Sequence, residues 1–165
     1  MTISADILRF HLDYSAWASL RLLEAARQLS AEDLTRDFGA SEKSVLGTLV
    51  HIFAADRAWL GRLAGKPPTA FVSPEDYRME VLESDWPKVL DGWREFAAGL
   101  TDESGAAVQV YKDLGGREWR MPLWQPLMHV VNHGTHHRGQ VAGFLRALGH
   151  KPPRTDLVIY YREIG

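Results

Sequence analysis

Residues 124–148 read WQPLMHVVNHGTHHRGQVAGFLRAL. Apolar residues recur in this stretch every three or four positions, the period that places side chains on one face of an α-helix. Pro126 suits the first turn of such a helix, and Gly149 allows the chain to leave it in a left-handed conformation. The stretch therefore predicts a long amphipathic helix that buries one face against other helices.

Histidines recur every four residues in the same stretch, at His129, His133 and His137. Side chains four apart lie one helical turn from each other, about 5.4 Å, so two neutral imidazoles can bind one metal ion. At about 100° per residue, His137 falls inside the apolar arc and His133 at its border. His129 and His136 lie further round, toward solvent. His133 and His137 are thus the best metal-binding pair, and His51 is a candidate for the third ligand.

Three more helices are predicted upstream. Ser4 can cap a helix over about residues 4–28, and Ser41 or Ser44 can begin a second one that ends at Gly65. A third is expected from about Asp85 to Leu100, with Pro87 in its first turn. Together with residues 124–148, these patterns predict an all-α protein, a four-helix bundle in which functional side chains project inward from facing helices.

Two shorter features are expected around the bundle. Ser73 and Pro74 can open a short helix in the segment 69–84. Val108, Val110 and residues 119–121 flank Asp113-Leu114-Gly115-Gly116, which predicts a small β-hairpin before the last long helix. After that helix we expect an extended or briefly helical tail. At 165 residues the whole chain, 1–165, is predicted to form a single domain.

The composition excludes several functions. The net charge is −2, which argues against nucleic-acid binding, because phosphate contacts need a clustered excess of Lys and Arg. We find no apolar run of membrane-spanning length and no signal-peptide core, so the sequence predicts a cytoplasmic protein without membrane contact. The chain contains no cysteine, so any metal must be held by imidazole, carboxylate or water. Any thiol in its chemistry must come from outside.

Three stretches resemble the DinB-like family, which belongs to a superfamily that also contains metal-dependent thiol S-transferases. They are DYSAW at 13–17, LVHI at 49–52 and, most specifically, VVNHGTHHRGQ at 130–140. The resemblance covers nearly the whole chain and implies a four-helix bundle, often a homodimer. By position, it also implies that a divalent metal is bound by His51, His133 and His137.

Three neutral imidazoles leave a dication with an open coordination position, which is typical of catalytic rather than closed structural sites. Thiol transfer and hydrolysis on a small molecule are both consistent with such a site; the resemblance favours thiol transfer, with a low-molecular-weight thiol as one substrate. Zinc and nickel are the first metal candidates, and iron also suits imidazole ligands. The alternative is a non-catalytic metal-binding protein that acts in a stress response through partner contacts.

Four other residues on the metal-bearing helices are predicted to have supporting roles. Gln140 and His129 lie near the predicted ligands and could support them, although both could equally be exposed polar residues. Asp56 and Arg138 fall on apolar arcs, and buried single charges are costly unless paired. We therefore predict an Asp56–Arg138 contact between the two helices that carry the predicted ligands.

Overall fold

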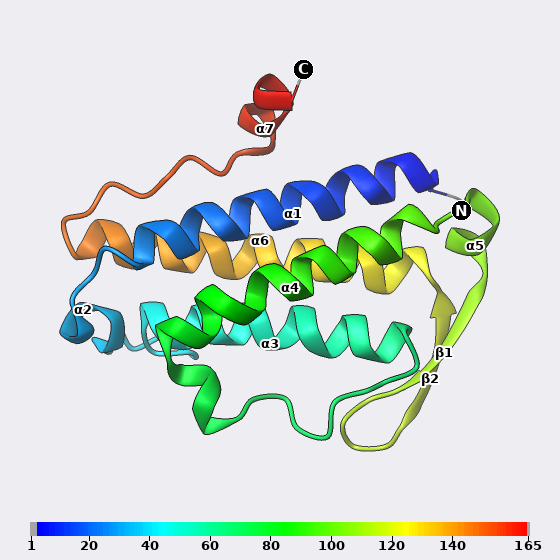
Figure 1. The fold of residues 1–165 in the computed structure, drawn as a ribbon, viewed down its shortest axis with the longest axis horizontal. Coiled ribbons are helices and arrows are strands. Elements are labelled where there is room, and N and C mark those ends of the chain that lie inside the picture. Colours follow the sequence, from blue (N-terminus) through cyan, green and yellow to red (C-terminus); the bar gives the residue numbers. More distant parts are fainter. Residues whose placement is uncertain (1–2, 165) are drawn as a thin grey trace.

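Four long helices lie side by side in the computed structural model, which describes residues 3–164 (Figure 1). The helices are α1 (Ala5–Ala26), α3 (Val45–Leu63), α4 (Met79–Ala98) and α6 (Trp124–Ala147). Helix α6 packs against both α1 and α3, and α4 packs against the same two helices from the other side. The predicted four-helix bundle is confirmed.

Shorter elements connect and flank the bundle. Strands β1 (Val108–Lys112) and β2 (Glu118–Pro122) form an antiparallel hairpin in which Tyr111 pairs with Trp119. This hairpin was predicted, and it lies at one end of the bundle, beside the start of α6 (Figure 1). The other short helices are α2 (Ala31–Thr35), η1 (Pro74–Tyr77), α5 (Asp102–Ala106) and α7 (Leu157–Ile164).

Serine side chains cap the first two long helices. The Ser4 hydroxyl accepts a hydrogen bond from the Ile7 amide, and Ser44 does the same for Gly47 at 3.0 Å. These bonds satisfy amides that have no partner within the first turn of a helix. The cap at Ser4 was predicted, and the structure selects Ser44 over Ser41 for α3.

The expected start of the third long helix was wrong. Helix α4 begins at Met79, six residues before Asp85, so Pro87 lies inside the helix instead of in its first turn. Leu82 and Trp86 are fully buried one turn apart. Their burial extends the core-facing side of α4 toward the amino end of the helix. Pro87 has no N–H, so the Glu83 carbonyl loses its backbone hydrogen bond. Glu83 is exposed, so water can bond to this carbonyl instead.

Side chains of all four long helices form the core. The arc predicted for α6 is buried at Leu127, Val130, Val131, Val141 and Leu145, with at most 6% of each side chain exposed. Burial of such aliphatic side chains stabilises the fold by roughly 2 kcal/mol each. This face of α6 is therefore anchored on its neighbours, and it fixes where the histidines of the same helix point.

The carboxyl-terminal segment returns along the outside of the bundle, and α7 lies over α1 (Figure 1). The Tyr14 hydroxyl donates to the Thr155 carbonyl at 2.9 Å, and Tyr160 packs against Phe10, Tyr14 and Trp17. The tail was expected to be extended or briefly helical, and α7 is its helical part. Among the described residues, no helix combines the length and apolar character needed to cross a membrane.

Candidate metal centre

Three imidazoles meet in the seam between α3 and α6. His51 comes from the middle of α3, and His133 and His137 come from successive turns of α6. One nitrogen from each ring lies within 4.8 Å of those of the other two. The ring of His137 is centred 4.4 Å from each of the other rings. The structure thus brings together the three residues that the sequence singled out, although whether they bind a metal stays a prediction.

The outward nitrogens of two rings are already engaged. The Nδ1 of His137 donates to the Gln140 side-chain oxygen at 2.7 Å. The Nδ1 of His51 faces the Glu42 carboxylate at 3.5 Å. The Gln140 oxygen can only accept, so this contact favours a proton on the Nδ1 of His137, and the Glu42 carboxylate favours the same tautomer of His51, as in metal sites where a carboxylate or carbonyl orients the ligand imidazole.

The inner nitrogens of His51 and His133 form a hydrogen bond with each other. The Nε2 atoms of His51 and His133 lie 2.9 Å apart. Burial and the neighbouring histidines lower the pKa of His133 to about 3, and burial is also the main cause that lowers the pKa of His51. Near neutral pH these two rings are therefore uncharged, which is the form that binds a transition metal. The donor set fits a divalent cation with nitrogen preference.

The loop that carries Phe71 packs against one side of the cluster and is held by hydrogen bonds from α3. The Phe71 ring packs edge-on against His51, with ring centres 5.5 Å apart. Arg57 fixes this loop: its guanidinium donates to both carboxylate oxygens of Asp76 at 2.7 and 2.8 Å and to the Phe71 carbonyl at 3.2 Å. The hydrogen bonds from Arg57 hold the pKa of the Asp76 carboxyl below its usual value. An ion pair between α3 and η1 thus places an apolar ring beside the candidate ligand.

His129 and His136 lie outside the cluster and are exposed, as the helical wheel predicted. The His129 ring lies between those of His133 and Trp59, at 5.6 and 5.3 Å. Gln140, the other supporting candidate, contacts a predicted ligand directly. Of the two supporting residues expected from the sequence, one therefore bonds a cluster member and the other borders the cluster.

The predicted Asp56–Arg138 contact is wrong. Among the described residues no ion pair joins them: Asp56 accepts from the Trp86 indole at 2.9 Å. Arg138 donates instead to Ser15 and Thr135, at 2.9 and 3.0 Å. Both charges are buried as expected, but hydroxyl and indole groups, which the wheels of two helices alone do not include, satisfy them.

The Arg138 site requires a glycine one turn earlier. A side chain at Gly134 would begin 2.6 Å from Arg138 Nη1 and 3.4 Å from Ser15 Oγ. The absence of a side chain at this position lets the guanidinium fold back along α6 and reach α1. The Gly134 in the quoted histidine stretch therefore serves the Arg138 site and not the histidine cluster.

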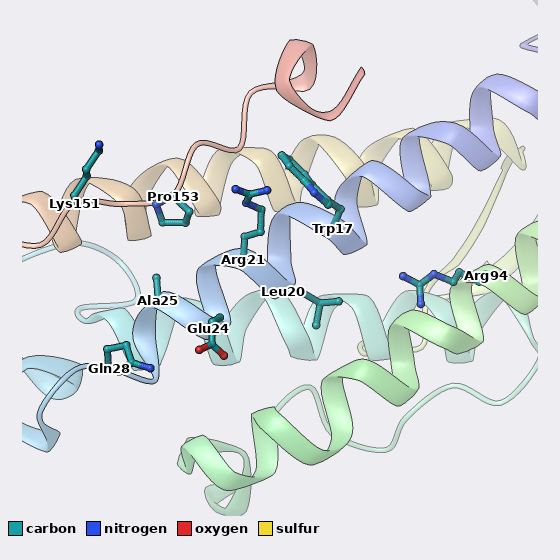
Figure 2. A pocket seen from close by; sticks show the side chains of 9 residues that line it. All are labelled: Trp17, Leu20, Arg21, Glu24, Ala25, Gln28, Arg94, Lys151 and Pro153. Carbon is teal, nitrogen blue, oxygen red and sulfur yellow. The ribbon is translucent and has the colours of Figure 1, made fainter. Parts of the chain in front are cut away.

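A groove of about 740 Å³ lies elsewhere, along the outer side of α1 (Figure 2). Figure 2 shows Arg94 and Lys151 at opposite ends of it, while Arg21, in the middle, is paired with Glu163 at 2.8 Å. Its polar groups do not converge on one point. For this reason the histidine cluster, where nitrogen donors do converge, is the candidate functional site.

Sequence reasoning missed Glu42 and Phe71. Both lie in connecting segments, where helical periodicity provides no information about direction. One sequence signal could have pointed to this segment, namely Gly47 in the first turn after the cap Ser44. In the structure a side chain at Gly47 would lie 2.2 Å from the Glu42 carbonyl. A glycine in the first turn of α3 thus lets the Glu42 segment pack closely on the helix that carries His51.

Comparison with known proteins agrees with this architecture. A sequence profile described as the DinB family matches residues 4–163. The chain is 22% identical over 158 residues to Protein DinB of Bacillus subtilis (strain 168), an alignment covering 90% of each protein. The crystal structure of a DinB-like protein from Bacillus cereus ATCC 10987 matches with a TM-score of 0.71 and 24% identity, covering 93% of this chain and 99% of that one. At this identity the structural likeness shows the shared fold.

Proposed function

Because the chain belongs to the DinB family, we propose that it is a metal-dependent enzyme in which His51, His133 and His137 bind one divalent cation and a small-molecule substrate reacts beside it. One observation carries the proposal. Three imidazole nitrogens converge within 4.8 Å, and Glu42 and Gln140 occupy the outer nitrogens of two of the rings. Zinc or nickel suits this donor set best, and iron is also compatible.

The residues of this chain would bind and orient the reactants. Metal-bound imidazoles carry no charge, so the three rings would not compensate a dication, and Phe71 packs against one side of the cluster. A bound divalent cation supplies Lewis acidity, which lowers the pKa of a thiol or a water molecule. His129 and His136 lie beside the cluster and are exposed, so they border the path of a substrate that approaches from this side.

Thiol transfer is the reaction that we favour, with hydrolysis as the second candidate. The chain has no cysteine, so a thiol must arrive as a substrate, and an uncompensated dication favours its thiolate form. The support for transfer over hydrolysis is the resemblance to a superfamily that contains thiol S-transferases. A non-catalytic metal-binding role is the alternative in a different class.

A single preparation can separate these possibilities. The full chain is purified without a histidine tag, and its metal content is measured by elemental analysis. We expect about one equivalent of divalent metal per chain. The loaded protein is then given an electrophile with or without a low-molecular-weight thiol, and sedimentation of the same sample checks for the proposed homodimer.

Each result selects one function. Turnover that requires both thiol and metal supports the transferase, and turnover with water alone supports the hydrolase. Bound metal without turnover favours the non-catalytic role. A protein that binds no divalent metal at micromolar concentrations would contradict the whole proposal.

A further inference from the structure

A second polar feature lies where the carboxyl end of α3 meets the hairpin. Arg62 lies there with its guanidinium carbon 4.9 Å from the centre of the Trp59 ring. Its Nε is buried without a hydrogen-bond partner among the described residues. The two terminal guanidinium nitrogens are not among the buried unpartnered atoms and form no hydrogen bond within the described residues, so they can donate to an acceptor from outside the chain.

Arg62 lines a pocket of about 230 Å³ between the end of α3 and the hairpin. Tyr111 and Lys112 of β1 and Glu118 of β2 also line it. In the described part of the chain neither Arg62 nor Lys112 forms an ion pair, whereas Glu118 accepts from Arg120 at 2.9 Å. Two cations and one carboxylate thus line the pocket, a net of one positive charge, which matches a monoanion. The planar Arg62 guanidinium suits a carboxylate.

Aromatic rings connect this pocket with the histidine cluster. Tyr111 packs on Trp59 with ring centres 5.1 Å apart. Trp59 packs on His129 at 5.3 Å, and His129 lies 5.6 Å from His133. A pocket of about 230 Å³ is smaller than the sites that usually hold a drug-sized ligand, about 300 to 1,000 Å³. It suits one end of a molecule whose remainder follows the rings to the cluster.

We propose that the Arg62 pocket is the carboxylate subsite for the substrate of the histidine centre. The substrate class is then an elongated organic carboxylate with its reactive group at the opposite end. Arg62 and Lys112 bind the carboxylate, Trp59 and Tyr111 contact the apolar body, and the reactive end lies beside His133. This inference rests on the proposed function, because the histidine centre must act on a substrate.

The subsite is tested first without metal. The metal-free full chain is titrated calorimetrically with 4-phenylbutyrate and with its uncharged analogue 4-phenylbutyramide. We expect the acid to bind about tenfold more tightly, the size of one charge-assisted hydrogen bond. Arg62→Met should remove this preference. Arg146→Met, which deletes an exposed arginine elsewhere on α6, should keep it.

Lys112→Met provides an independent test. Lys112 is an exposed residue of β1, so its substitution should leave the fold intact. Its preference for the acid should fall by about two- to threefold, because an exposed cation is screened by water. A wild-type protein that does not distinguish acid from amide overturns the subsite. So does retention of the full preference in both Arg62→Met and Lys112→Met.

The link to the histidine centre is tested on protein loaded with Co²⁺. Thiols of increasing length, from 3-mercaptopropionate to 11-mercaptoundecanoate, are compared with their amides, and the thiolate-to-cobalt absorption band reports binding. The preference for the acid should grow with length in the wild type and stay absent in Arg62→Met. A preference independent of length overturns the substrate assignment. Absence of the band with every thiol contradicts thiol binding at the histidine centre, while the phenylbutyrate result still decides the subsite.

Discussion

His137 and Arg138 are neighbours on α6, and both are buried, with 8% and 2% of their surfaces exposed. They face different helices. His137 joins His51 of α3, whereas Arg138 reaches Ser15 and Ser19 of α1. One buried polar side chain thus belongs to a cluster of imidazoles, and the next donates hydrogen bonds to hydroxyl groups.

The two sites differ in how their polar groups are satisfied. Around Arg138, hydroxyl groups of the chain accept the guanidinium protons, and Gly134 makes room for them. Around His137, three imidazole nitrogens converge within 4.8 Å, and those of His51 and His133 share one hydrogen bond. A site that the protein satisfies stabilises the fold, and a site left incomplete is available to a ligand.

The largest effect is expected for His133→Ala. Loss of one of three imidazoles leaves two ligands, so metal affinity should fall by roughly a thousandfold, more than the 10- to 100-fold typical of outer-shell partners. Competition with a chromophoric chelator measures the constant, and elemental analysis measures the content. Arg138→Met is the matched control on the adjacent helical face and should keep one equivalent of metal. Equal metal loss in the two variants would contradict the distinction between the sites.

Asp56 provides a pH-dependent effect on the Arg138 side of the bundle. Burial raises the pKa of its carboxyl to about 6, against the opposing hydrogen bond from Trp86 and the charge of Arg138. The ordinary value is 3.8, so the folded state binds this proton more tightly than the unfolded state. The stabilisation is fully present below about pH 3.8 and is lost as the pH rises through about 6.

Asp56→Asn should therefore be more stable than the wild type at neutral pH. The amide imitates the protonated acid and can still accept from the Trp86 indole. About two pKa units correspond to a gain of up to about 3 kcal/mol above pH 7, which disappears below about pH 4. Urea unfolding across this range measures the gap. Asp91→Asn, on an exposed position of α4, is the control, and a pH-independent gap in Asp56→Asn would contradict the assignment.

Gly134→Ala tests the packing of the Arg138 site. The new methyl group would lie 2.6 Å from the buried guanidinium, which has little freedom to move. We expect a loss of about 2 kcal/mol in the free energy of unfolding, as for other overpacked interiors. At Gly143, on the same helix, a methyl group meets nothing within 4 Å, so Gly143→Ala should stabilise by about 1 kcal/mol. Similar values for the two variants would show that the guanidinium moves freely.

The smallest effect is expected for the outer partners of the cluster. Gln140→Leu removes the acceptor at 2.7 Å from His137, and metal affinity should fall by about tenfold while one equivalent still binds. Glu42→Gln should cost less, because its contact with His51 is longer, 3.5 Å. The same chelator competition ranks the variants. A larger loss for Glu42→Gln would show that its charge, and not the hydrogen bond, supports the site.

Sequence patterns predicted the features that are determined within a single element of secondary structure. The period of apolar residues located the buried face of α6, and turn chemistry located the hairpin and the cap at Ser4. The start of α4 was missed because no sequence signal marks Met79. Burial of Leu82 extends the helix upstream of Pro87, which the prediction had placed in its first turn. Tertiary packing there outweighs the local cost of proline.

The sequence alone determined that His133 and His137 share one helical face, since a spacing of four residues fixes this geometry in any α-helix. Only the tertiary structure decided the rest of the cluster, including the approach of His51 and the contacts of Glu42 and Gln140. It also separated Asp56 from Arg138 and gave each a neutral partner. Helical periodicity defines directions within an element, whereas the distance between elements depends on how their side chains pack.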